Sequence, residues 1–142
     1  MEEIIELLDK DLAYIKHEIA GDTINIYVKS NREAIKCQYC GTESSKVHSR
    51  KIQKIQDLPM AGIKVNIQLL RRKIFCRNRE CGHKTFTERF EFIEGKTRKT
   101  KRLYEEIMRV SLTQSSVSAS KYLRRSVANV GKSTICNMLK KR

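Results

Sequence analysis

The sequence predicts an α+β fold, with a small β-rich part over residues 1–95 and an all-α part over residues 96–142. Two observations predict the β-rich part: apolar and polar residues alternate in several segments, and four of the five cysteines form two closely spaced pairs. Beyond Gly95, apolar residues recur every three or four positions, which is typical of helices. We therefore expect a domain boundary between Gly95 and Lys96.

The N-terminal segment predicts a short helix followed by a β-hairpin. Residues 2–8 read as a helix with four apolar positions. Residues 12–19 and 23–28 form the expected arms of the hairpin around an Ala20-Gly21-Asp22 turn. In the second arm Ile24, Ile26 and Val28 alternate with polar residues, which is the period of a half-buried strand.

Two further strands are expected over residues 52–58 and 64–75. Pro59-Met60-Ala61-Gly62 supplies the turn between them. In the second strand, Val65, Ile67 and Leu69 share one face, and the strand runs directly into Cys76. The segment 85–93, which carries three phenylalanines, is expected to close this unit.

The paired cysteines predict a metal site. Cys37 and Cys40 lie in CQYCG, and Cys76 and Cys81 lie in CRNREC. Spacings of two to four residues let both sulfurs of a pair face one ion, and four thiolates suit the tetrahedral preference of Zn²⁺. We expect one structural zinc in a zinc-ribbon-like unit, with Phe86 packed over it. Free cysteines are the alternative, and His83 is the alternative fourth ligand in place of Cys81.

The fifth cysteine, Cys136, lies between apolar residues of the last expected helix. We expect it to be a small buried side chain, because nothing nearby supplies the base that a catalytic thiol needs.

Charge is concentrated in the C-terminal third. The chain has a formal net charge of +14, and 13 of its 30 basic residues but only 2 of its 16 acidic residues follow Gly95. Such an excess favours a polyanion partner, and double-stranded DNA is the commonest; a solvated basic surface is the alternative. No apolar stretch is long enough to cross a bilayer, and the acidic N-terminus does not resemble a secretory signal. We expect no membrane partner and a cytoplasmic location.

Three helices are expected in the second part. Leu103, Ile107 and Val110 share one face of the first, and residues 113–116 offer caps for the second. Asn129 is expected to reverse the chain in a left-handed conformation before a last helix over residues 132–141, whose inward side chains are Ile135, Met138 and Leu139. This arrangement predicts a helix-turn-helix.

The last helix would enter the major groove of DNA and read base edges from its N-terminal turns. Lys96 and Arg98 precede the first helix and are expected to contact phosphates or a minor groove, and Arg142 to contact a phosphate. The other expected DNA contacts are Lys99, Lys101, Arg102, Arg124, Arg125, Lys132, Ser133, Thr134, Asn137, Lys140 and Lys141.

Several motifs in succession resemble the N-terminal portion of insertion-sequence transposases of the ISL-three group. The motifs are CQYCG, Asp57-Leu58-Pro59 followed by Gly62, Arg71-Arg72 before Cys76, Phe86-Thr87-Glu88, and VGKSTI at residues 130–135. Gln38, Asn129 and Gly131 depart from that pattern. The resemblance implies a bacterial, nucleoid-associated protein that binds the terminal inverted repeats of a mobile element, alone, as a homodimer or with a full-length transposase. It also implies that the RNase H-like catalytic domain would begin after Arg142.

The expected function is therefore the DNA-binding N-terminal part of a transposase, without cleavage. Strand transfer needs carboxylates that converge on divalent metals, and after Gly95 the only acidic residues are the adjacent Glu105 and Glu106. The alternatives are a stand-alone transcription regulator with the same zinc and helix-turn-helix parts, an inhibitor of transposition, or RNA binding or protein bridging through the zinc unit.

Overall fold

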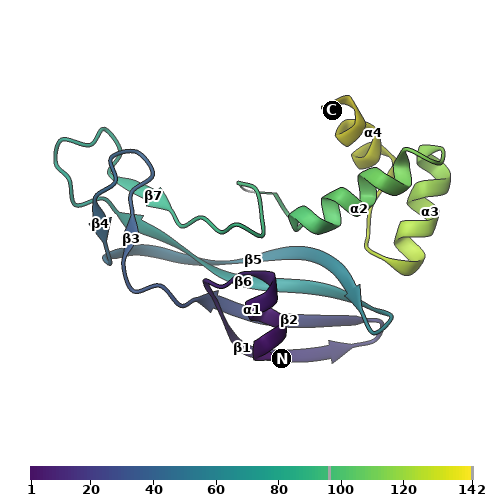
Figure 1. The fold of residues 1–142 in the computed structure, drawn as a ribbon, viewed down its shortest axis with the longest axis horizontal. Helices are drawn as coiled ribbons and strands as arrows, with labels where there is room; N and C mark the ends of the chain where they lie inside the picture. Colours follow the sequence, from purple (N-terminus) through teal and green to yellow (C-terminus); the bar gives the residue numbers. More distant parts are fainter. Residues whose placement is uncertain (96, 142) are drawn as a thin grey trace.

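The computed structural model describes residues 1–95 and 97–141, and it confirms a mixed α+β protein whose sheet-rich part precedes three helices (Figure 1). The expected phosphate contacts of Lys96 and Arg142 lie outside the described residues. The elements in chain order are α1 (Glu2–Leu8), β1 (Leu12–Ala20), β2 (Thr23–Ser30), β3 (Ile35–Lys36), β4 (Glu43–Ser44), β5 (Val47–Met60), β6 (Ile63–Phe75), β7 (Thr85–Thr87), α2 (Lys101–Ser111), α3 (Ser116–Ser126) and α4 (Lys132–Lys140).

The main sheet has the strand order β1-β2-β6-β5, and β7 pairs with the end of β6. The β1–β2 and β5–β6 pairs are antiparallel, as expected for hairpins, whereas β2 and β6 run parallel. Parallel strands need a long crossover connection. Here residues 31–62 provide it, and they contain the first cysteine pair and all of β5.

Alternation along the central strands produces the main core. Ile24, Ile26 and Val28 of β2 lie in register with Val65, Ile67 and Leu69 of β6, and all six side chains are buried. Helix α1 contributes Ile5, and the segment after β7 contributes Phe90, Phe92 and Ile93. The sheet is therefore covered on this face by elements from both ends of the sheet-rich part.

The turn between β5 and β6 is tighter than expected. Strand β5 continues to Met60, and Ala61 and Gly62 alone form the loop, with φ of 51° and 76°. Two successive positive φ values characterise a type I′ hairpin, whose twist matches that of the flanking strands. Pro59 instead lies in a register shift of β5 between Asp57 and Met60, where strand pairing is irregular and its missing N–H is tolerated.

The three C-terminal helices enclose a second core built on Leu103, Ile107, Leu123 and Ile135, each fully buried. As expected, Leu103, Ile107 and Val110 of α2 and Ile135 and Met138 of α4 face this core, and Leu139 packs against it half-buried. The hydroxyl of Ser115 accepts a hydrogen bond from the Ser118 amide and caps α3, as predicted.

Asn129 does not adopt the predicted left-handed conformation. Among the described non-glycine residues only Ala61 has a positive φ. Instead, Asn129 exchanges two hydrogen bonds with the Gln56 side chain of β5, through its amide N–H (2.8 Å) and its carbonyl oxygen (3.2 Å). Contact with the sheet, rather than a strained backbone, therefore fixes the connection between α3 and α4.

The sheet and the helices meet along the end of β5. Leu58 packs against the helical core, and the buried carboxylate of Asp57 accepts a hydrogen bond from the Thr100 hydroxyl at 2.8 Å. The same hydroxyl accepts from the Leu103 amide and so caps α2. In the described part of the chain, no helix is long and apolar enough to cross a membrane.

Candidate metal centre and basic helices

The four paired cysteines converge on one point. The sulfur atoms of Cys37, Cys40, Cys76 and Cys81 all lie within 4.8 Å of one another, with 4.0 Å between those of Cys37 and Cys81 and 3.5 Å between those of Cys40 and Cys76. Four sulfurs at about 2.3 Å from a tetrahedral zinc ion would be about 3.8 Å apart. The donor set and its spacing therefore fit one structural Zn²⁺.

Backbone hydrogen bonds shape the two cysteine loops. The Gly41 amide donates to the Cys37 carbonyl (2.8 Å) and the Cys37 amide donates to the Thr42 carbonyl (2.9 Å), while Gly41 adopts a φ of 78° that favours glycine. On the other side, the Cys76 amide donates to the Lys84 carbonyl at 2.8 Å. These hydrogen bonds bring the sulfurs of each pair to the same side of its loop.

The pKa values of Cys40, Cys76 and Cys81 are shifted in different directions. Hydrogen bonds from Thr42 lower the pKa of Cys40 to about 6. A backbone hydrogen bond at Asn78 lowers the pKa of Cys76, but desolvation and the neighbouring sulfurs outweigh it and raise this pKa to about 12. Cys40 therefore loses its proton readily, whereas Cys76 keeps its proton. A bound cation would favour the deprotonated form of every ligand.

A small apolar cluster covers the sulfurs. Ile35, Ile74 and Phe86 are buried together with Cys37, and Cys76 and Cys81 pack against them. The prediction that Phe86 packs over the metal site is confirmed. This cluster is separate from the main core, so the zinc end of the sheet has its own apolar support.

His83 does not join the cysteine group. Its exposed imidazole stacks on the Tyr39 ring, with 3.4 Å between the ring centroids and 7° between the planes. Tyr39 lies between the two cysteines of the first pair, so this stack joins the two loops on their outer side. The four-cysteine interpretation, rather than the His83 alternative, is the one the described geometry supports.

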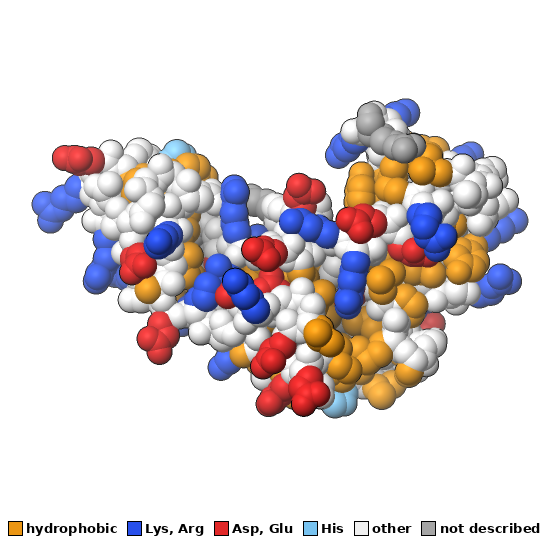
Figure 2. Space-filling model, in the orientation of Figure 1, with side chains coloured by type: hydrophobic (Ala, Val, Ile, Leu, Met, Phe, Trp, Pro, Cys, Tyr) orange, Lys and Arg blue, Asp and Glu red, His pale blue; other side chains and the backbone are white. Residues whose placement is uncertain are grey.

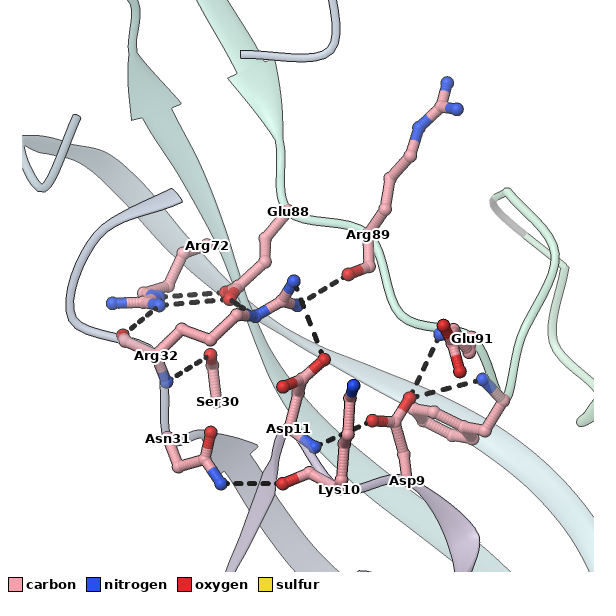
Figure 3. Close-up of polar contacts among 11 residues, drawn as sticks. Asp9, Lys10, Asp11, Ser30, Asn31, Arg32, Arg72, Glu88, Arg89 and Glu91 are labelled. Atoms are coloured by element: carbon pink, nitrogen blue, oxygen red, sulfur yellow. Dashed lines mark hydrogen bonds and ion pairs between the residues drawn. The ribbon is translucent and has the colours of Figure 1, made fainter. Parts of the chain in front are cut away.

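A buried carboxylate, that of Glu88, pairs with Arg72 on β6, the strand that leads into Cys76 (Figure 3). Glu88 is fully buried and accepts two hydrogen bonds from the Arg72 guanidinium, at 2.9 and 3.0 Å. Arg32 approaches the same carboxylate at 3.2 Å and also pairs with Asp11. The Arg71-Arg72 and Phe86-Thr87-Glu88 motifs therefore have structural roles: Glu88 neutralises Arg72, and Phe86 covers the sulfurs.

The predicted DNA-contact residues of α4 lie on one exposed surface. Lys132, Ser133, Asn137 and Lys140 are exposed and Thr134 is half-buried, whereas Ile135 and Met138 face the helical core. The exposed Lys141 follows the helix. Cys136 is half-buried rather than buried as predicted, and its thiol lies 3.5 Å from the Ser116 hydroxyl.

Gly131, at the N-cap of α4, offers no capping side chain. A Cβ at this position would lie 3.2 Å from a guanidinium nitrogen of Arg124, which occupies the space beside it. The Nε of Arg124 donates to the Val130 carbonyl at 3.2 Å, and the Ser120 hydroxyl donates to the same oxygen at 2.7 Å. The helix start is thus held from α3, with the exposed Arg124 beside it.

The basic residues around the start of α2 have different surroundings. Arg102 donates to the buried Asp57 carboxylate through Nε at 2.8 Å and through Nη2. Burial lowers the pKa of Lys99, which is half-buried beside β5. Lys101 and Arg125 are exposed. Sequence periodicity could not separate Arg102, which pairs with a buried carboxylate, from the other basic residues of this segment.

The fold and the four-cysteine site define a zinc ribbon followed by a helical unit. Residues 33–83 match the family described as the zinc-finger of transposase IS204/IS1001/IS1096/IS1165, so this segment is similar to the zinc ribbons of those transposases. Over 65 residues, or 46% of the chain, the sequence is 31% identical to the transposase for insertion sequence element IS1001 of Bordetella parapertussis, and the match spans 16% of that relative. No solved structure matches the chain.

Proposed function

We propose that this chain is the DNA-binding part of an insertion-sequence transposase, with α3 and α4 forming a helix-turn-helix that recognises the terminal inverted repeats of the element. The observation that carries the proposal is the surface of α4. Its polar residues are exposed over a buried apolar side, and neither α3 nor α4 contains an acidic residue. The match to a transposase zinc ribbon supports the ends of a mobile element as the DNA target.

In this proposal some residues of α4 contact base edges and others contact phosphates. Asn137 reads a base edge, because its amide can bind adenine with two hydrogen bonds, and Ser133 and Thr134 read less selectively. Lys132, Lys140 and Lys141 neutralise phosphates. Arg124 and Arg125, near the end of α3, contact the backbone beside the start of α4. The zinc holds the ribbon in shape and takes no part in reading.

The chain binds DNA without cutting it in this proposal. Apart from the four cysteines, the described residues contain no group of three His, Cys, Asp or Glu side chains close enough to share a metal ion. A chain of this function lies on the bacterial nucleoid, alone, as a homodimer or beside a full-length transposase. Incubation with Mg²⁺ or Mn²⁺ and a supercoiled plasmid carrying the repeats should leave the plasmid intact, and nicking would contradict this part.

Selection from a pool of randomised DNA duplexes tests the recognition surface. The wild-type chain should enrich one sequence, and Asn137→Ala should lose about 1–3 kcal/mol of binding free energy for it while binding unrelated duplexes as before. Lys121→Ala, at an exposed lysine of α3 outside the proposed contacts, is the control and should keep the preference. Unchanged selection by Asn137→Ala would remove α4 from the reading role.

A stand-alone transcription regulator is the second candidate, since it would use the same surface. The selected sequence separates the two: a match to the inverted repeats at the ends of a mobile element supports the transposase assignment, and a match within a promoter supports the regulator.

A further inference from the structure

A second basic surface lies on the sheet, away from α4. A groove of about 830 Å³ runs along β5 and the end of β6, and Thr87 of β7 and Arg98 complete its lining. Figure 2 shows the molecule hollowed between its zinc-binding end and its helices, with basic and some acidic side chains along the hollow. Sequence patterns do not predict this groove, because its basic residues are spread over three segments.

The lining of the groove is one-sided in charge. It includes six basic residues and no acidic ones; the exposed Glu91 and Glu94 of the neighbouring segment are not part of the lining. The basic residues are Lys51, Lys54, Arg71, Arg72, Lys73 and Arg98. In the described part of the chain, only Arg72 among them is paired with a carboxylate.

Arg71 adds a buried positive charge to the lining of the groove, and all three of its hydrogen bonds go to neutral groups. Its side chain is buried, and its guanidinium donates to three neutral oxygens: the carbonyls of Glu88 (3.0 Å) and Gly95 (2.9 Å) and the side chain of Gln53 (2.9 Å). A buried cation without a hydrogen-bonded carboxylate attracts an anion to the nearest solvent-filled space. Here that space is the groove.

The groove adjoins the start of the proposed recognition helix. Gln56 lines the groove, and its side chain exchanges two hydrogen bonds with Asn129, two residues before the N-cap of α4. Lys64 of β6 also reaches Asn129, at 3.3 Å. These hydrogen bonds to Asn129 thus link the basic groove to the connection between α3 and α4.

We propose that this groove binds the phosphate backbone of the same DNA duplex that α4 reads, on the flank of the recognised sequence. The inference rests on the proposed function. The exposed Lys51, Lys54, Lys73 and Arg98 neutralise phosphates, Arg71 adds its buried positive charge, and no base is read. The groove therefore adds affinity without sequence preference and lengthens the interface with DNA.

The test compares two variants of equal net charge. The groove variant carries Lys51→Gln, Lys54→Gln and Arg98→Gln, which spares the buried Arg71 and the carboxylate-paired Arg72. The control carries Lys10→Gln, Lys16→Gln and Lys29→Gln, at exposed lysines near and on β1 and β2, toward the opposite edge of the sheet. Zinc content and melting temperature establish that both variants fold like the wild type.

Binding is measured by fluorescence anisotropy at several salt concentrations, on the selected duplex and on a 40-bp duplex of unrelated sequence. The groove variant should bind both duplexes roughly tenfold more weakly, and the slope of log affinity against log salt should become shallower by about 3, roughly one for each phosphate that is no longer neutralised. Its hydroxyl-radical footprint should shorten on one flank. The control should behave like the wild type.

The outcomes distinguish this inference from the proposed function. A groove variant with the affinity, salt slope and footprint of the control overturns the inference, even if Asn137→Ala still weakens binding to the selected sequence. A groove variant that loses affinity for an RNA duplex but keeps it for DNA also overturns it. If the wild type selects no sequence but its salt-dependent DNA binding requires the groove, the groove is supported and the reading role of α4 fails.

Discussion

Arg102 lies against the carboxylate of Asp57, with its Nε 2.8 Å from Oδ1 and its Nη2 bonded to Oδ2. Asp57 is almost fully buried, whereas the arginine side chain is 47% exposed. Asp57, near the end of β5, is therefore the residue through which the sheet holds α2, the first of the three C-terminal helices.

Removing the arginine should destabilise the protein more than removing a surface ion pair. Arg102→Met leaves a buried carboxylate with only the Thr100 hydroxyl, and we expect it to lower the free energy of unfolding by about 2 kcal/mol. Arg109→Met, which breaks the exposed pair with Glu106, is the matched control and should cost at most about 0.5 kcal/mol. Urea denaturation measures both free energies of unfolding. Equal losses in the two variants would contradict a structural role for the Arg102–Asp57 pair between sheet and helices.

Loss of zinc should unfold one end of the molecule only. The apolar cluster around the sulfurs is separate from the two larger cores, so Cys37→Ser with Cys76→Ser should abolish the single bound zinc and the hydrogen-exchange protection of amides in the cysteine loops. Protection of Ile26 and Ile107 amides should remain. Cys136→Ser should retain one zinc per chain by elemental analysis; global unfolding of the double variant would show that the cores depend on the metal.

Zinc affinity should rise with pH. At neutral pH Cys40, with a pKa of about 6, has already lost its proton, but Cys76, with a pKa of about 12, and Cys81, with a raised pKa, still hold theirs. Zinc displaces these protons, so acid opposes binding and base favours it. Calorimetry at pH 7 in buffers of different ionisation enthalpy should report about two or more protons released per zinc. Release of none would contradict the protonation pattern.

The hairpin loop offers a stabilising substitution. Ala61 has a φ of 51°, which costs an alanine roughly 1 kcal/mol, and asparagine tolerates this conformation better. Ala61→Asn should therefore raise the free energy of unfolding by up to about 1 kcal/mol. Thermal denaturation measures the change, and Asn129→Gly, at a position without a positive φ, should give no such gain. A lower melting temperature for Ala61→Asn would contradict the type I′ turn.

Local patterns predict much of this molecule, and long-range contacts account for what they miss. Alternation marks β2 and β6, helical spacing marks α2, and the cysteine spacing indicates the ligand set, since each signal lies within a few residues. No such signal shows that Arg102 pairs with Asp57, that Glu88 neutralises Arg72, or that β2 runs parallel to β6. The left-handed conformation predicted for Asn129 is wrong for the same reason, because its partner Gln56 is 73 residues away.

The parallel pairing of β2 and β6 has a consequence for how the chain folds as it is synthesised. Strand β2 is complete by Ser30, but its partner residues run from Lys64 to Leu70. In a nascent chain the apolar side of the first hairpin therefore stays exposed, and one edge of β2 stays unpaired, until the whole crossover has left the ribosome. Strand β6 leads directly into Cys76. The metal site can therefore form only after β6 has been synthesised, long after Cys37 and Cys40. A pause in translation between these points would expose the hairpin to aggregation or to chaperones.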